Sequence, residues 1–201
     1  MDGLLKESTA QRWMDGTAAL AVLARLRTTE LVVTTMGATR EWSRLTDSPW
    51  DLHYLPSAMG HAPMLGLGLA LARPERSVIV LNGDGSQLMS LGCLVTIAAS
   101  GATNLTLVVL DNGVYEVTGG QATPGRIAGV DFALIARGAG FPTAATFDDI
   151  SAWEQQAGTC LAGPGPRLIA LHVSPVTQDV VPRVTISLPE RLRRLRTRLN
   201  A

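Results

Sequence analysis

The feature that most constrains the fold is a pair of short apolar runs joined by a helix-like segment. The first run, residues 77–81, lies between Arg-Pro-Glu and Asn-Gly-Asp-Gly, and the second, residues 105–110, ends at Asp-Asn-Gly. Short apolar runs bounded by turn residues favour buried strands over helices. Apolar residues at helical spacing connect the two runs. The sequence therefore predicts two parallel strands with a right-handed crossover helix between them.

The ends of these two strands carry polar groups that suit an anion and a cation. The first strand turns at Gly83-Asp84-Gly85, and Ser86 is the predicted cap of the next helix, whose first N–H groups would face an anion. The second strand ends near Asn112. A right-handed crossover places both strand ends side by side, so Asp84 and Asn112 are expected to meet. One carboxylate and one amide oxygen suit Mg²⁺ when a ligand's phosphates complete its coordination.

Further strands and helices alternate along the rest of the chain. Strands are predicted at residues 31–35, 50–55, 142–146 and 167–173, and helices at residues 8–27, 65–72, 131–138 and 148–161. Asp131 and Asp148 are the predicted caps of the last two helices. This alternation predicts an α/β fold, a doubly wound and mostly parallel sheet with helices on both faces.

The C-terminal region differs in composition from the rest. Residues 176–188 form a predicted linker that contains proline, and an amphipathic helix follows, in which leucines line one face and five arginines occupy the other positions. The leucines are Leu188, Leu192, Leu195 and Leu199. They are expected to pack on a partner or on their own domain. The predicted organisation is a main domain at residues 1–175 and a linker with a basic helix at residues 176–201.

The composition narrows the class of protein. The chain of 201 residues is 46% hydrophobic with a formal net charge of zero, which is typical of a globular domain and not of a disordered or nucleic-acid-binding chain. The two cysteines have no CxxC spacing and are expected to be reduced. No apolar segment approaches the roughly 20 residues that cross a membrane, and no secretory leader is recognised. A cytoplasmic enzyme subunit is expected.

The spacing of these motifs is similar to that of a known family. Gly83-Asp84-Gly85, followed by 27 residues between Asp84 and Asn112, resembles the GDG…N motif of thiamine-diphosphate-dependent enzymes. The resemblance implies that Asp84, Asn112 and the carbonyl of Val114 bind Mg²⁺. It also implies contact between the cofactor and a set of small residues at the strand ends, namely Gly37, Gly83, Gly85 and Ser86. For Gly37, an ordinary turn after the first strand is an equal alternative.

A second stretch, residues 56–62, resembles the GSMGHA segment of sulfopyruvate and phosphonopyruvate decarboxylases. Ser57 stands where that family usually has glycine, and Ala58 where it has serine. The resemblance implies that Ser57, Ala58 and Met59 contact the cofactor, and that the Met59 side chain holds it in the bent conformation needed for catalysis. A plain core methionine is the alternative for Met59. For His61, structural use and substrate contact are both open.

A third stretch, from Asn112 to Gln121, resembles the NxxYxxTGGQ segment of the same decarboxylases. The resemblance implies that Tyr115 contacts the cofactor and that Gln121, with Met59, takes part in catalysis. Its glycines allow the backbone to approach a ligand closely. A surface loop without such a role is the alternative. Arg126, further along, would meet an anionic substrate or solvent.

The resemblance covers about residues 30–173 and implies half of an enzyme. In the family a glutamate that activates the cofactor's pyrimidine comes from a separate domain, and no glutamate here lies in such a stretch. The expectation is therefore the β-type subunit of a two-subunit decarboxylase of a 2-oxo acid, with thiamine diphosphate and Mg²⁺. A pyrimidine-domain α-type subunit would supply the glutamate, in a hetero-oligomer such as α2β2. A carboligase subunit and a non-catalytic binding subunit are the alternatives.

Overall fold

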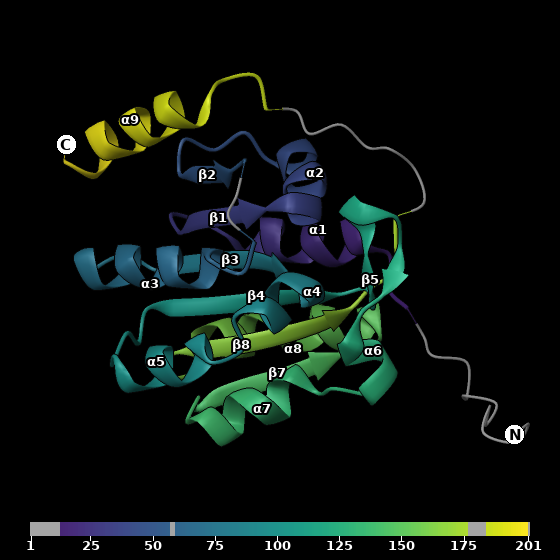
Figure 1. Cartoon of the computed structure of the whole chain (residues 1–201). Helices are drawn as coiled ribbons and strands as arrows, with labels where there is room; N and C mark the ends of the chain where they lie inside the picture. Colours follow the sequence, from purple (N-terminus) through teal and green to yellow (C-terminus); the bar gives the residue numbers. More distant parts are fainter. Residues whose placement is uncertain (1–12, 57–58, 177–183, 201) are drawn as a thin grey trace, which may run out of the picture.

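A computed structural model of the chain describes residues 13–56, 59–176 and 184–200. Within them a six-stranded sheet forms the centre, with all neighbouring strands parallel, in the order β2-β1-β3-β4-β8-β7 (Figure 1). The strands are β1 Leu31–Thr35, β2 Asp51–Tyr54, β3 Val78–Gly83, β4 Leu105–Asp111, β7 Thr143–Phe147 and β8 Arg167–His172. The predicted doubly wound α/β sheet is confirmed.

Helices cover both faces of this sheet because its strands are apolar on both sides. Val78 and Val80 of β3 belong to one buried cluster, whereas Ile79 and Leu81 of the same strand belong to the other. The first cluster includes residues of α3 (Ala62–Ala72), α5 (Cys93–Ala99), α7 (Phe132–Ala139) and α9 (Leu188–Leu199). The second includes residues of α1 (Gly16–Leu26), α2 (Met36–Leu45) and α8 (Ile150–Ala162).

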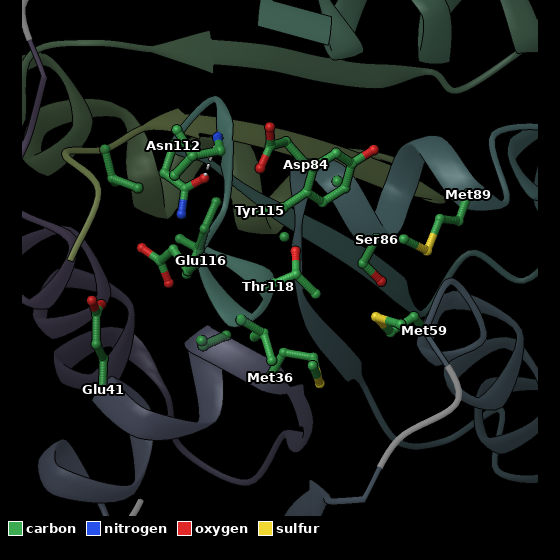
Figure 2. Close-up of a pocket in the computed structure, with 18 of the residues that line it drawn as sticks. Met36, Glu41, Met59, Asp84, Ser86, Met89, Asn112, Tyr115, Glu116 and Thr118 are labelled. Carbon is green, nitrogen blue, oxygen red and sulfur yellow. Dashed lines mark hydrogen bonds between the residues drawn. The ribbon is translucent and has the colours of Figure 1, made fainter. Parts of the chain in front are cut away.

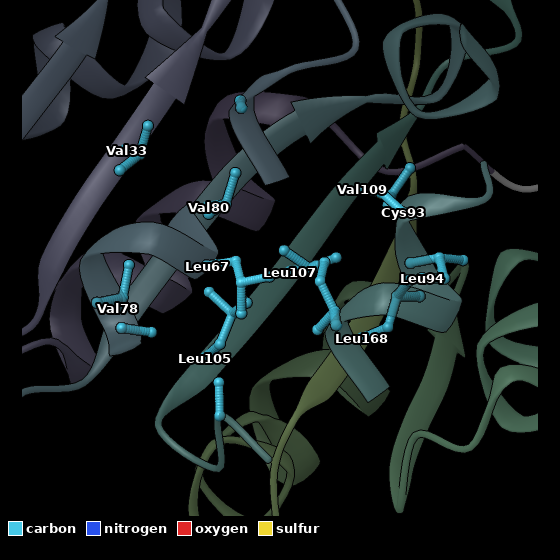
Figure 3. Close-up of a cluster of buried hydrophobic side chains, with 14 of the residues drawn as sticks. Val33, Leu67, Val78, Val80, Cys93, Leu94, Leu105, Leu107, Val109 and Leu168 are labelled. Carbon is cyan, nitrogen blue, oxygen red and sulfur yellow. The ribbon is translucent and has the colours of Figure 1, made fainter. Parts of the chain in front are cut away.

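The first cluster shows how closely α3 approaches the sheet (Figure 3). A Cβ atom added at Gly66 would lie 2.2 Å from Cγ2 of Val80, so only glycine fits there. Leu67 on the same helix and Leu105 and Leu107 on β4 are almost fully buried. Each such side chain contributes about 1.5–3 kcal/mol to folding through its removal from water.

Several helix boundaries differ from the prediction. The helix predicted after Ser86 is two helices, α4 (Asp84–Met89) and α5, which are separated around Gly92. The first of them begins at Asp84 and not after a Ser86 cap, and Gly83 is its N-cap residue. Helix α8 is capped by Asp149, whose side chain accepts a hydrogen bond from Ala152 N, and not by Asp148.

Other segments are also more ordered, or placed differently, than predicted. Helix α1 begins at Gly16 and is capped by Asp15, while the predicted start at residue 8 lies outside the described residues. Met14, which lies before this helix, forms an isolated parallel β-bridge with Val173. The segment after Asn112 forms a small antiparallel hairpin, β5 (Val114–Tyr115) and β6 (Gln121–Ala122), around the 3-10 turn η1 (Glu116–Thr118), and α6 (Pro124–Ala128) follows.

The leucine stripe of α9 packs against the chain's own domain. Leu195 is 6% exposed, and Leu188 and Leu199 contact the first cluster, whereas Leu192 remains 43% exposed. The guanidinium of Arg191 is buried, and its Nη2 donates a 2.6 Å hydrogen bond to the carbonyl of Leu55. The C-terminal amphipathic helix is thus present and covers the region of β2. None of the described helices combines the length and apolar character needed to cross a membrane.

Candidate functional site

A cavity of about 280 Å³ opens at the carboxyl ends of β1, β3 and β4 (Figure 2). In open α/β sheets this is where ligands bind, because the loops after adjacent strands diverge there. The walls come from five segments: the first part of α2, Met59, α4 with the end of β3, the end of β4 with its hairpin, and residues 173–174 after β8. They include Met36, Gly37, Glu41, Gly83, Asp84, Gly85, Ser86, Met89, Asn112, Val114, Tyr115, Glu116 and Thr118.

Asp84 is the buried acidic group of this cavity. It is 2% exposed, and its Oδ2 accepts a 2.9 Å hydrogen bond from Thr123 Oγ1. Burial and the nearby Asp111 carboxylate raise the pKa of Asp84 to about 6, although the Thr123 hydrogen bond acts in the opposite direction. No lysine or arginine among the described residues forms an ion pair with it. A buried carboxyl group without a cationic side chain fits a bound cation.

Asn112 and Val114 line the same cavity from the other strand end, as predicted (Figure 2). Asn112 Oδ1 accepts a 3.0 Å hydrogen bond from the N–H of Val114, which fixes the turn between them. Among the described residues, no group of three or more His, Cys, Asp or Glu side chains is placed so that it could hold a metal ion by itself. This oxygen set therefore fits a cation such as Mg²⁺ that takes its remaining ligands from phosphate and water.

At the start of α4, Gly83 leaves the backbone open to a ligand, whereas Gly85 is covered by Tyr115. A Cβ atom at Gly83 would meet no atom within 4 Å, so that wall of the cavity is clear. A Cβ atom at Gly85 would lie 2.5 Å from Cε1 of Tyr115, which packs on it. Ser86 Oγ accepts a 3.0 Å hydrogen bond from Gly60 N. The serine predicted as a helix cap thus connects α4 to the segment that carries Met59.

Three methionines form one end of the cavity (Figure 2). Met59 is 46% exposed and Met89 is 52% exposed, so neither is a core methionine. Met36 has a φ of 46°, which is unfavourable for a residue with a side chain, at the junction of β1 and α2. Ser57 and Ala58, the other predicted contacts of this segment, lie outside the described residues.

The opposite end of the cavity is charged. Arg40 Nη2 lies 2.8 Å from Glu116 Oε2, and Glu116 Oε1 accepts a 2.8 Å hydrogen bond from Val176 N. A Cβ atom at Gly37 would lie 2.8 Å from Glu116 Oε2, which explains the glycine at this predicted cofactor contact. Glu41 completes this end.

Several lining or supporting residues were not anticipated from the sequence: Met36, Glu41, Met89, Glu116 and Thr123. For Met36 the position directly after a predicted strand was the available signal, whereas Glu41 lies six residues beyond that strand. No sequence signal pointed to Thr123, because it reaches Asp84 only through tertiary packing.

Gln121 and Arg126 do not line this cavity in the described structure. Gln121 is exposed on β6, where its Nε2 donates a 3.0 Å hydrogen bond to the carbonyl of Thr118. The guanidinium of Arg126 lies 5.7 Å from the ring of Trp13, and the side chain is exposed. The catalytic role of Gln121 stays a prediction.

The three histidines have local partners. His61 Nδ1 lies 3.1 Å from the Met59 carbonyl, and the residue is exposed. His53 Nδ1 lies 2.9 Å from Thr34 Oγ1, and burial lowers its pKa. His172 Nε2 lies 3.4 Å from Asp111 Oδ2 at the end of β8.

The fold and this site agree with a family model. The model of the thiamine pyrophosphate enzyme C-terminal TPP-binding domain matches residues 33–171, and the chain belongs to this family. That range includes Asp84, Asn112 and most of the cavity wall. The cofactor of the domain is thus thiamine pyrophosphate, which is thiamine diphosphate.

Two curated relatives are similar over most of this chain. Phosphonopyruvate decarboxylase of Streptomyces viridochromogenes is 39% identical over 177 residues, which are 87% of this chain and 43% of the relative. Sulfopyruvate decarboxylase subunit beta of Methanothermobacter thermautotrophicus is 43% identical over 152 residues, 75% of this chain and 77% of the relative. The chain thus spans less than half of the first relative and about three quarters of the second.

Solved structures share the fold. A thiamin diphosphate-dependent enzyme isolated from Mycobacterium smegmatis superposes with a TM-score of 0.68 at 25% identity, over 81% of this chain and 32% of that one. Benzoylformate decarboxylase from Polynucleobacter necessarius superposes with a TM-score of 0.67 at 18% identity, over 84% of this chain and 35% of that one, a likeness of fold alone.

Proposed function

We propose that this chain is the diphosphate-binding, β-type subunit of a thiamine-diphosphate- and Mg²⁺-dependent decarboxylase of a 2-oxo acid. The observation that carries the proposal is Asp84, a buried carboxyl group without a cationic side chain, beside Asn112 at the strand ends. The names of the two relatives support a 2-oxo acid with a second anionic group, such as sulfopyruvate or phosphonopyruvate.

The residues of the cavity divide into two functions in this proposal. Asp84, Asn112 and the Val114 carbonyl would hold Mg²⁺ and through it the diphosphate, because these oxygens come from two adjacent strand ends. Met59 would support the other half of the cofactor from the apolar end. The remaining proposed contacts are the small or polar groups along the wall, namely Gly37, Ser57, Ala58, Gly83, Gly85, Ser86 and Tyr115.

Bound thiamine diphosphate would supply the electron sink that decarboxylation of a 2-oxo acid requires. The chain's own residues would bind, orient and shield the cofactor. Asp84 lines the cavity, and the hydrogen bond from Thr123 fixes the orientation of its carboxylate. The Gly60–Ser86 hydrogen bond holds the Met59 segment against the start of α4, so both halves of the site keep their spacing. The Gln121 side chain would join the site only in the assembled enzyme.

A second, α-type subunit with a pyrimidine-binding domain completes the proposed enzyme and supplies the activating glutamate. Two observations support it. The chain covers 43% of the phosphonopyruvate decarboxylase relative, which leaves more than half of that protein unmatched, whereas the sulfopyruvate decarboxylase relative is named as subunit beta. The Met59 side of the cavity is also open, with Met59 and Met89 about half exposed. A hetero-oligomer such as α2β2 would cover it.

The proposed domain organisation is a cofactor domain at residues 1–175 and a linker with a docked helix at residues 176–201. A carboligase subunit would use the same cavity with a second carbonyl substrate, and product analysis distinguishes the two activities. A non-catalytic binding subunit is less well supported, because the buried charge of Asp84 costs stability unless a cation uses it.

Calorimetry with thiamine diphosphate and Mg²⁺ tests the cofactor assignment. Asp84→Ala should abolish Mg²⁺-dependent binding, because the diphosphate loses its bridging cation. Asp84→Asn keeps the side-chain shape and should also lose binding, while the cofactor-free chain becomes more stable by about 1–3 kcal/mol, since a buried charge is removed. Unchanged affinity in both variants would show that Asp84 does not hold the metal.

A further inference from the structure

Glu41 of α2 is half-buried, and one of its two carboxyl oxygens is buried without a hydrogen-bond partner among the described residues. Its Oε2 atom is shielded from solvent and has no hydrogen-bond partner in the described part of the chain. Arg40, its neighbour on the helix, pairs with Glu116 at 2.8 Å. A buried polar atom is nearly always paired, so Oε2 needs a partner that the described residues do not supply.

Burial first, and then two nearby carboxylates, shift Glu41 toward its neutral form. Asp15 at the start of α1 and Glu116 of η1 are both acidic, while Arg40 and Arg44 of α2 are basic. Burial is the largest effect, and with the two carboxylates it raises the pKa of Glu41 to about 7, against the opposing effect of Arg40. A neutral carboxyl group has an O–H to donate, whereas a carboxylate only accepts.

Glu41 also lies where two hollows meet. It lines the cofactor cavity and an adjoining cavity of about 260 Å³, and the two share Gly37, Glu41 and Ser174. Figure 2 shows Glu41 with Glu116 and Asn112 at one end of the site, away from Met59 and Met89 at the other end. In the proposed function, the end that contains Asn112 takes the metal and the phosphates, and the methionine end takes the rings.

We propose that Glu41 is a positioning residue that donates its carboxyl O–H to a terminal phosphate oxygen of bound thiamine diphosphate. This inference rests on the proposed function. A phosphate oxygen would be the partner that Oε2 lacks. A neutral donor also avoids setting a third carboxylate, beside those of Asp15 and Glu116, against an anion.

Calorimetric titration of the full chain with Mg²⁺ and thiamine diphosphate from pH 6 to 8.5 tests this, with Glu41→Gln as the informative variant. Donation needs the proton, so the contact is present below the pKa of Glu41 and is lost above it. Wild-type affinity relative to Glu41→Gln should fall about fivefold between pH 7 and pH 8, because the amide N–H₂ donates at every pH. Other titrations, including those of Asp84 and of the phosphates, occur in both proteins and cancel in the ratio.

Two further ligands locate the contact. With inorganic pyrophosphate and Mg²⁺, the ratio of wild-type to Glu41→Gln affinity should still fall as the pH rises. With thiamine monophosphate this ratio should not change with pH, because the terminal phosphate is absent. Glu154→Gln, an exposed residue that pairs with Arg25, is the matched control and should follow wild type at every pH.

A ratio that stays constant with pH, or one that persists with thiamine monophosphate, would overturn the role of Glu41. Loss of binding in Asp84→Ala together with such a constant ratio would reject Glu41 alone. Unchanged binding in Asp84→Ala, or no binding by the wild-type chain, would reject the proposed cofactor site and this inference with it.

Discussion

Gly85 shows at the scale of one residue how a side chain is excluded from this site. A Cβ atom there would lie 2.5 Å from Cε1 and 2.7 Å from Cδ1 of Tyr115, so the ring and the hairpin that carries it would have to move. Gly85→Ala should therefore lower the free energy of unfolding by about 1–3 kcal/mol and weaken thiamine diphosphate binding by about tenfold or more.

Gly138→Ala is the matched control for this prediction. Gly138 lies in α7 with open space around its added Cβ, so alanine should stabilise the chain by about 0.5–1 kcal/mol through helix propensity. Thermal denaturation and calorimetry measure both variants. A Gly85→Ala protein that binds as wild type does would show that Tyr115 moves at no cost.

Met59 tests whether an exposed apolar side chain serves the cofactor. Because 46% of it is exposed, Met59→Ala should cost little folding stability, well below the 2–5 kcal/mol typical of a buried methionine. In the assembled enzyme, turnover should fall while the affinity for Mg²⁺ and diphosphate stays near wild type, because the proposed metal ligands lie at the other end of the cavity. Steady-state kinetics beside calorimetry separates the two effects. Full turnover would argue against cofactor support by Met59.

At the scale of an element, α3 has an outer face that the described chain leaves uncovered. Met64 is 37% and Leu71 is 54% exposed, and an added Cβ at Gly68 between them would meet no atom within 4 Å. The helix contains no charged side chain and begins three residues after Met59. An apolar helix face beside an open site is typical of a subunit interface.

Gly68→Arg should therefore leave the isolated chain folded but weaken its assembly with the α-type subunit by tenfold or more, because a charge would be buried in the interface. Gly158→Arg, on the exposed face of α8, is the control with equal steric freedom and should assemble normally. Analytical ultracentrifugation of the co-expressed subunits measures both. Normal assembly of Gly68→Arg would place the interface elsewhere.

At the scale of the whole molecule, the chain is expected to be inactive alone. Without a glutamate placed against the cofactor's pyrimidine, the purified chain should neither decarboxylate 2-oxo acids nor accelerate exchange of the C2 proton of thiamine diphosphate. Proton exchange measured by NMR, with and without the α-type subunit, is the test. Accelerated exchange by the isolated chain would mean that one of its own carboxylates activates the cofactor, and the two-subunit proposal would fail.

The strands were predictable because their signal is local. The runs that became β3 and β4 are apolar along their length, since both sides of a central parallel strand are buried. The break between α4 and α5 was not predictable in the same way, because Leu88, Leu91 and Leu94 keep helical spacing across it. The sequence predicts Ser86 as a helix cap, whereas its hydroxyl accepts a hydrogen bond from Gly60 N, 26 residues away.

By itself, the sequence determined the strands of the sheet, the turns that contain glycine and the positions of Asp84 and Asn112 at two strand ends. Turn residues and apolar runs act on their own neighbours along the chain. Only the tertiary structure decided what surrounds that pair. Thr123 reaches Asp84 across 39 residues, and Arg40 reaches Glu116 across 76. The neutral form that Glu41 favours is likewise set by burial and by carboxylates from two other segments. Burial and charge act through space, so these properties exist only once distant segments have packed together.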